Sequence, residues 1–121
     1  MASPSAANAA AFYRQVIETG TVWMLWSEKG GPTARTAGGD HAVPFWSSKS
    51  RAERVVATVP SYAGYTVRHE SLARWREQWL PDLDREGLRV GLNWSGAKAV
   101  GYDLDPISVE ESLLAYEDAR A

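Results

Sequence analysis

The segment HAVPFWSSKSRAERVVATV, residues 41–59, decides the fold, because it joins a strand, a corner and a helix without a linker. Residues 41–46 predict a short buried strand, and the serine-rich corner after them leads at once into a helix that Pro60 ends. Pro44 has no N–H for a sheet ladder, so it places the strand at an edge or where that N–H would face away. The rest of the chain can be arranged in layers around this unit.

The helix after the corner has clear capping and burial signals. Ser50 and Glu53 have the spacing of a capping box, although Ser47 or Ser48 could cap an earlier start. The positions expected to be buried recur at helical spacing: Ala52, Val55, Val56 and Val59. Lys49, Arg51 and Arg54 are left on the entry turn and the outer face.

The segments before the corner predict a helix and a central strand. Residues 1–7 are small and polar and predict a disordered tail, so the single domain is expected to span residues 8–121, with a helix from Asn8. Between Thr21 and Glu28, apolar residues occupy both the even and the odd positions, which point to opposite faces of a strand. This pattern is typical of a central strand covered on both faces.

The segments after the corner predict one more strand and two more helices. Residues 65–69 should form a strand reached through a helix, which favours a parallel, right-handed crossover from the strand at 41–46. Leu72, Trp75, Trp79 and Leu83 share one helix face, and Pro81 should break or kink that helix. The last helix should start after Pro106, with Ser108 and Glu111 as a second capping box.

Residues 88–104 predict an antiparallel hairpin. A three-residue loop, Ser95 to Ala97, would set Val90 against Tyr102, with the apolar residues in phase on one face. The same register would pair Arg89 with Asp103 and Gly91 with Gly101 on the other face. We expect this register or a bulged equivalent.

Together these elements predict one α+β or α/β domain, with a mixed, mostly antiparallel sheet of about five strands and helices packed on it. The length of 121 residues fits a single domain. Six tryptophans are many for such a chain, and they are expected to mark the core or a binding face.

Composition argues against several classes of function. The formal charge of −2 does not favour nucleic acid as a partner. No apolar run approaches the roughly 20 residues needed to cross a bilayer, and the N-terminus lacks the basic region of a signal peptide. The chain has no cysteine, which fits a reducing cytoplasm. We therefore expect a cytoplasmic protein with no membrane or nucleic-acid partner.

Anion binding is the best supported chemistry. The predicted helix start carries Ser47 and Ser48 together with three cations, Lys49, Arg51 and Arg54. If the strands on either side are parallel, His69 should lie in the same cleft, with Arg68 near it. A capped, solvated helix start that binds nothing would explain the same residues.

Catalysis and metal binding have weaker signals. Ser47 and Ser48 lack the flanking glycines of a nucleophile elbow, and capping explains them more simply. His41 and His69 are isolated and lack the spacing of a zinc motif. We predict no catalytic residues, no metal site and no cofactor. Trp46, Asn93 and Trp94 lie at a strand end and a hairpin tip, where partial exposure would suit a protein interface.

Several segments in order resemble the bacterial domain-of-unknown-function family 2750. They are Val22-Trp23 with Leu25, Pro44-Phe45-Trp46, Ala52-Glu53-Arg54, Trp79-Leu80-Pro81, Gly87, Gly91 to Gly96 and Gly101-Tyr102-Asp103. The resemblance covers residues 12–116 and implies a small α/β protein of bacterial origin, with no established activity.

Two functional hypotheses follow. The first is a non-enzymatic module that binds a protein partner or a small anionic ligand, for example an immunity or accessory protein. The alternative is a small enzyme acting on an anionic substrate, with Ser47 or Ser48, Arg51 and His69 in one cleft.

Overall fold

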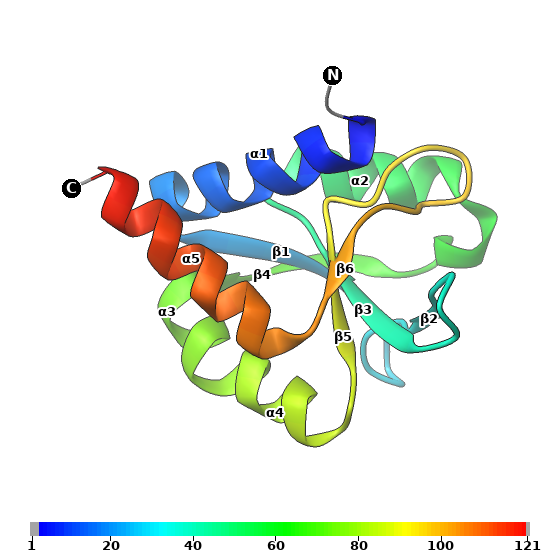
Figure 1. Ribbon diagram of the computed structural model, residues 1–121. Helices are drawn as coiled ribbons and strands as arrows, with labels where there is room; N and C mark the ends of the chain where they lie inside the picture. Colours follow the sequence, from blue (N-terminus) through cyan, green and yellow to red (C-terminus); the bar gives the residue numbers. More distant parts are fainter. Residues whose placement is uncertain (1–2, 121) are drawn as a thin grey trace.

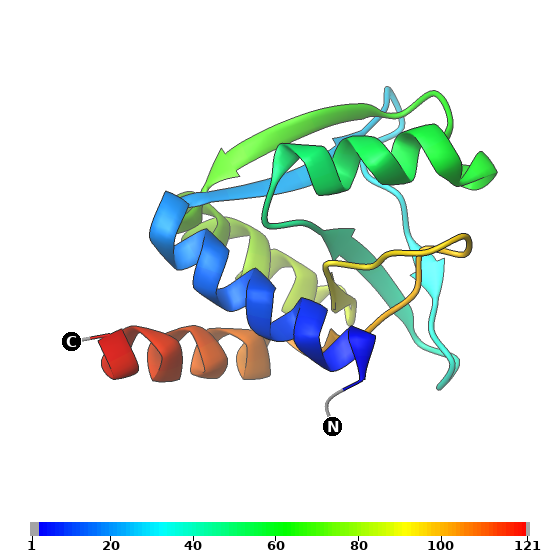
Figure 2. The same cartoon turned by 90° about the horizontal axis from the view of Figure 1, so that it is seen from above.

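The computed structural model describes residues 3–120 and shows one small α+β domain (Figures 1 and 2). The α-helices are α1 (Pro4–Thr19), α2 (Lys49–Thr58), α3 (Leu72–Arg74), α4 (Leu80–Arg85) and α5 (Pro106–Arg120). A short 3-10 turn, η1 (Pro60–Tyr62), follows α2, and a π-helical turn, η2 (Trp75–Trp79), joins α3 to α4. The strands are β1 (Thr21–Trp26), β2 (Ala34–Arg35), β3 (His41–Phe45), β4 (Thr66–Ser71), β5 (Arg89–Leu92) and β6 (Asp103–Leu104).

The strands form two sheets that are joined by one backbone pairing between Trp23 and Trp46. One sheet has the order β2-β3-β5-β6, and the other is the antiparallel pair β1-β4. Trp23 on β1 and Trp46, just after β3, exchange two backbone hydrogen bonds of 2.8 Å, which join the two sheets. Among the paired strands of residues 3–120, only β3 and β5 are parallel, so the expected mostly antiparallel arrangement is confirmed, although as two linked sheets.

The predicted crossover to residues 65–69 has the expected direction, but β4 does not pair with β3. Strand β1 lies between them and is antiparallel to both, so β3 and β4 run the same way without being neighbours. Strand β4 runs antiparallel to β1, with Trp23 opposite His69. The chain reverses after α2 through η1 and through Gly64, whose φ of 92° is a left-handed conformation open to glycine. This reversal brings β4 back along β1 instead of beside β3.

The position of Pro44 explains how a proline is tolerated between two strands. Ala42 pairs with Ala34 on β2, and Trp46 pairs with Trp23 on β1, both on the same edge of β3. Alternate residues of a strand point their N–H groups to the same edge, so the missing N–H of Pro44 falls between these two short pairings. The predicted position facing away from a ladder is therefore confirmed.

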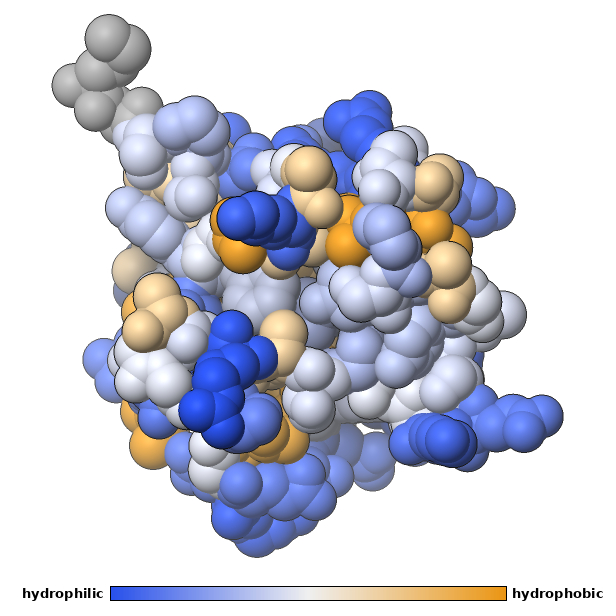
Figure 3. All heavy atoms as spheres, turned by 90° about the vertical axis from the view of Figure 1, so that its right-hand side faces the viewer, coloured by the Kyte–Doolittle hydropathy of each residue, from blue (hydrophilic) through white to orange (hydrophobic). Residues whose placement is uncertain are grey.

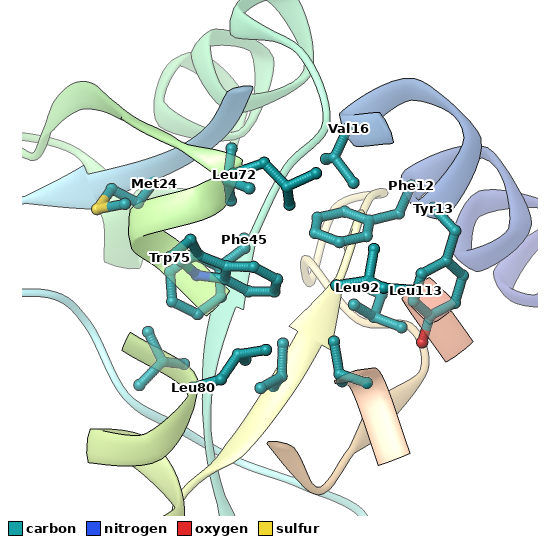
Figure 4. Close-up of a cluster of buried hydrophobic side chains, with 14 of the residues drawn as sticks. Phe12, Tyr13, Val16, Met24, Phe45, Leu72, Trp75, Leu80, Leu92 and Leu113 are labelled. Carbon is teal, nitrogen blue, oxygen red and sulfur yellow. The ribbon is translucent and has the colours of Figure 1, made fainter. Parts of the chain in front are cut away.

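Two apolar clusters lie on opposite faces of β1. Val22 and Met24 belong to a large cluster with α1, α5 and the α3–α4 segment, in which Trp75 packs against Phe12 and Phe45 (Figure 4). Leu25 points the other way, into a smaller cluster with α2. A strand covered on both faces is what the apolar pattern of residues 21–28 predicted.

Two of three helix starts differ in detail from prediction. Helix α1 begins at Pro4, four residues before the predicted start at Asn8, because Ser3 caps it and Pro4 suits the first turn. Residues 4–7 of the predicted disordered tail are therefore helical, and residues 1–2 lie outside the described part of the chain. Ser48 caps α2, which is the earlier start left open beside the Ser50 capping box. Asp105, not Ser108, accepts the hydrogen bonds at the start of α5.

Pro81 is accommodated by a π-helical turn. The backbone N–H of Leu80 donates to Trp75 instead of to the residue four positions back. The wider turn lets the helix continue past Pro81 with Leu72, Trp75, Leu80 and Leu83 buried.

The predicted hairpin register is wrong by two residues. Val90 lies opposite Leu104 and Gly91 opposite Asp103, and the tip has Ser95 opposite Val100. The indole of Trp94 folds back over Gly91 and Gly101, and a Cβ at either glycine would approach it to 2.5 Å or 2.8 Å. The two glycines therefore make room for Trp94 instead of facing each other.

Candidate anion-binding site

The start of α2 lies beside α1 (Figure 2). A hollow of about 430 Å³ is lined by residues of both segments. We call it the corner hollow. Its lining comes from α1 and from the corner at the start of α2: Gln15, Thr19, Ser47, Ser48, Ser50, Arg51 and Arg54. Four residues predicted to bind an anion, Ser47, Ser48, Arg51 and Arg54, are thus brought together.

The backbone of the corner is fixed by capping. The hydroxyl of Ser48 accepts a hydrogen bond of 3.3 Å from the backbone N–H of Arg51. The first N–H groups of a helix have no partner inside the helix, so those of Lys49 and Ser50 have none there, and Ser50 lines the hollow. These amides and the positive end of the helix dipole favour negative charge there.

Beneath the corner lies a buried polar cluster centred on Asn93. Its side-chain carbonyl accepts from the backbone N–H of Ser47 at 2.8 Å, and its amide donates to Ser47 Oγ at 2.9 Å. The same amide reaches the backbone carbonyl of Asn8 at 3.1 Å, and Ser47 Oγ donates to Gln15 Oε1 at 2.5 Å. Ser47 and Asn93 are 2% and 1% exposed, so this cluster ties α1, β5 and the corner together.

Within residues 3–120, the arginines at the corner have no carboxylate partner. Arg51 and Arg54 are three residues apart on one face of α2, and no residue between 3 and 120 forms a salt bridge with either. Burial, and then the neighbouring charge of Arg54, lower the pKa of the half-buried Arg51 guanidinium. The corner therefore presents two adjacent cations with no counter-charge from the described chain.

The same two arginines line a second hollow of about 360 Å³, which we call the tryptophan hollow. On the side of α2 it is bounded by Arg51, Arg54, Val55 and Thr58. The other side is the loop that follows β5, with Trp94, Ser95, Gly96 and Ala97. Arg51 and Arg54 thus stand between the two hollows.

The structure separates the remaining predicted anion ligands from the corner. Lys49 is exposed and lines neither hollow. Arg68 lies over the ring of Trp26, with its guanidinium carbon 4.9 Å from the ring centroid, and the His69 ring lies 5.0 Å from that of Trp23. Arg68 and His69 do not line the corner hollow with Ser47, because β1 lies between β4 and the corner.

The expected exposure of Trp46, Asn93 and Trp94 is also wrong. Trp46 is 0% exposed and Trp94 is 4% exposed. The indole of Trp46 donates to the backbone carbonyl of Trp94 at 2.8 Å, and the indole of Trp94 donates to that of Tyr102 at 2.8 Å. Their polar atoms are satisfied inside the fold, so these tryptophans hold the loop after β5 in place.

The convergence required by the enzyme hypothesis is not found. Ser47 is buried and hydrogen-bonded to Gln15 and Asn93, and Ser48 caps α2. No histidine lines the corner hollow or the tryptophan hollow. Within residues 3–120, no three carboxylate or imidazole side chains are grouped to hold a metal ion.

Sequence reasoning did not identify the residues that complete the two hollows. Gln15 and Thr19 come from α1, and Ser95 to Ala97 come from the hairpin tip. A signal for Gln15 was present, because it is the polar neighbour of the apolar stripe formed by Phe12 and Val16. Four large apolar side chains that the predictions did not place at the surface are exposed: Val100, Tyr102, Ile107 and Leu114.

The fold and the corner define a small α+β protein with a hollow lined by two arginines. The chain belongs to the family DUF2750, proteins of unknown function, whose model matches residues 9–113. The predicted family resemblance is thereby confirmed. A search of curated proteins finds no match. No helix between residues 3 and 120 is long and apolar enough to cross a membrane.

Proposed function

We propose that the protein is a binding module that holds an anionic group in the corner hollow, between the start of α2 and the guanidinium groups of Arg51 and Arg54. The ligand would be a small anion or the anionic group of a larger ligand. The proposal concerns binding and assigns no reaction to the site.

The observation that carries the proposal is the contrast among the three half-buried arginines. Arg76 pairs with Glu110 and Glu117, and Arg89 pairs with Asp103. Hydrogen bonds to these carboxylates raise the pKa of both guanidinium groups, whereas burial lowers the pKa of Arg51. Arg51 has no carboxylate partner within the described chain, and a second cation, Arg54, lies beside it.

Removing charge from water without a counter-ion is unfavourable, so an anion that entered the hollow would recover part of that cost. A guanidinium can grip a carboxylate or a phosphate with two parallel hydrogen bonds. The free amides at the start of α2 would add donors on the other side of the same anion. These three features favour a phosphate, sulfate or carboxylate group over a neutral ligand.

The proposal predicts that inorganic phosphate stabilises the protein. At a concentration about tenfold above its Kd, an anion that binds only the folded state should add about 1.4 kcal/mol to the free energy of unfolding. This corresponds to a rise of several degrees in Tm. Thermal unfolding in phosphate, compared with chloride at equal ionic strength, measures the effect.

The matched variants are Arg51→Ala and Arg85→Ala. Both remove one positive charge, but Arg85 lies on α4 and pairs with Asp82 at the surface. Arg51→Ala should abolish the shift caused by phosphate, and Arg85→Ala should keep it. An equal shift in both variants, or no shift in the unaltered protein, would contradict an anion site at the corner.

A further inference from the structure

We infer that the ligand is amphiphilic: its anionic group is held at Arg51 and Arg54, and its apolar body fills the tryptophan hollow. This inference rests on the proposed function and adds the chemical class of the ligand, which is a small molecule with one anionic end and a flat apolar body.

The two hollows meet at the same pair of guanidinium groups. Arg51 and Arg54 each line both the corner hollow and the tryptophan hollow. An anion bound by them would therefore leave the rest of its molecule beside the tryptophan hollow. The spacing of three residues along α2 places both cations on the same side of the helix as the hollow's mouth.

The lining of the tryptophan hollow offers few polar partners apart from the two arginines. The hydroxyl of Thr58 donates to the backbone carbonyl of Arg54 at 2.7 Å. The hydroxyl of Ser95 accepts a hydrogen bond of 3.0 Å from the side chain of Asn8. Each hydroxyl already has one partner, and the rest of the lining is Val55, Trp94, Gly96 and Ala97. Such a surface favours an apolar body.

The wall formed by Trp94 is rigid. Its indole N–H is bonded to the Tyr102 carbonyl, and its ring is held against Gly91 and Gly101. Trp94 borders the hollow although only 4% of its surface is exposed, and a preformed hollow needs little ordering when a ligand enters. The volume of about 360 Å³ is near the lower end of the range for small-molecule pockets, roughly 300–1,000 Å³. A body of one or two fused rings suits this size.

The side of the molecule that carries the β2 hairpin and the loop after β5 also shows apolar patches set between hydrophilic side chains (Figure 3). On this side a separate hollow of about 250 Å³ includes Tyr62, Lys98 and again Trp94. It does not reach Arg51 or Arg54, so an amphiphile anchored at the corner would not occupy it.

Three probes separate the two parts of the ligand. Inorganic phosphate carries only the anion, naphthalene-methanol only the apolar body, and 1-naphthyl phosphate both. We expect 1-naphthyl phosphate to bind at least tenfold more tightly than either of the others. In an NMR titration of the full chain, ring-current shifts should appear at the amides of Gly96 and Ala97. Phosphate alone should mainly shift the amides at the start of α2.

Variants separate the binding of the apolar body from the binding of the anionic group. Ala97 is exposed on a loop, so Ala97→Phe should fill the tryptophan hollow without disturbing the core, and it should remove most of the tenfold preference for 1-naphthyl phosphate. Arg51→Ala should weaken both anionic probes, and Arg85→Ala should change neither.

The outcomes distinguish this inference from the proposed function. Equal Kd values for phosphate and 1-naphthyl phosphate would overturn the amphiphile and leave the anion site standing. Equal binding of naphthalene-methanol and 1-naphthyl phosphate, unaffected by Arg51→Ala, would overturn both. A preference for 1-naphthyl phosphate that persists in Ala97→Phe would show that its rings lie elsewhere and would also overturn the inference.

Discussion

Asn93→Ala is expected to lower the free energy of unfolding by about 3 kcal/mol, because Asn93 does two things that alanine cannot. Its side chain satisfies the buried N–H of Ser47, the hydroxyl of Ser47 and the carbonyl of Asn8. Its backbone has a φ of 51°, a left-handed conformation that asparagine tolerates better than alanine. An unpaired buried donor costs about 1–3 kcal/mol, and the conformation adds about 1 kcal/mol.

Urea unfolding of two further variants separates these contributions. Asn93→Gly loses the same hydrogen bonds but keeps an easy left-handed backbone, so its loss should be about 1 kcal/mol smaller. Asn8→Ala removes one exposed hydrogen bond to Ser95 and should cost less than about 1 kcal/mol. If Asn93→Ala and Asn8→Ala were equally mild, the buried cluster would not hold the corner as described.

The second large effect is expected for Gly91→Ala, at about 3 kcal/mol, although the change adds only one methyl group. The new Cβ would lie 2.5 Å from Cε2 of Trp94 and 2.7 Å from Cζ2. The indole has no free path away, because Trp94 is 4% exposed and the indole N–H donates to the Tyr102 carbonyl. The backbone carbonyl of Trp94 is also held, since it accepts from the indole of Trp46. Overpacking should therefore be relieved only by displacing the loop after β5.

A double-mutant cycle with Trp94→Ala checks this explanation. In the Trp94→Ala background, Gly91→Ala should cost less than about 1 kcal/mol, which leaves a coupling energy of about 2 kcal/mol. Gly38→Ala is the matched control, because its nearest neighbours would lie 3.8 Å from the new Cβ, and it should be neutral within about 0.5 kcal/mol. The same loss in both backgrounds would show that Gly91 is required for another reason.

Local patterns predicted the elements well. Apolar residues at both even and odd positions of residues 21–28 correctly indicated a strand with both faces covered. The spacing of Ala52, Val55, Val56 and Val59 indicated the inner side of α2, although Val56 is only partly buried and Val59 follows the last helical residue. These features depend on residues close in sequence. Side-chain polarity along one segment is enough to reveal them.

Pairing and register were less predictable, because they depend on distant residues. The neighbour of β4 is set by a full ladder with β1, which lies some forty residues earlier, as the pair Thr66 and Trp26 shows. The hairpin register is set by Trp94 folding over Gly91 and Gly101, a contact that alternation of apolar residues cannot reveal. The sequence pattern pointed to Gly91 and Gly101, but not to Trp94, which packs against both.

The candidate site, like the fold, could be predicted only where its residues are neighbours in sequence. Ser48, Arg51 and Arg54 are neighbours in sequence, and they remain neighbours in the hollow. Gln15 and Ala97 reach the same region only through the packing of α1 and the hairpin tip against α2. Asn93, predicted at an interface, instead anchors the corner from beneath, since a buried amide and an exposed one look alike in sequence.

The most direct test of the anion site is a titration of the full chain with inorganic phosphate, followed by amide chemical shifts. We predict saturating shifts at one Kd, largest from Ser48 to Arg51, and their loss in Arg51→Ala but not in Arg85→Ala. Shifts that do not saturate, or that are largest away from the start of α2 and persist in Arg51→Ala, would contradict the account.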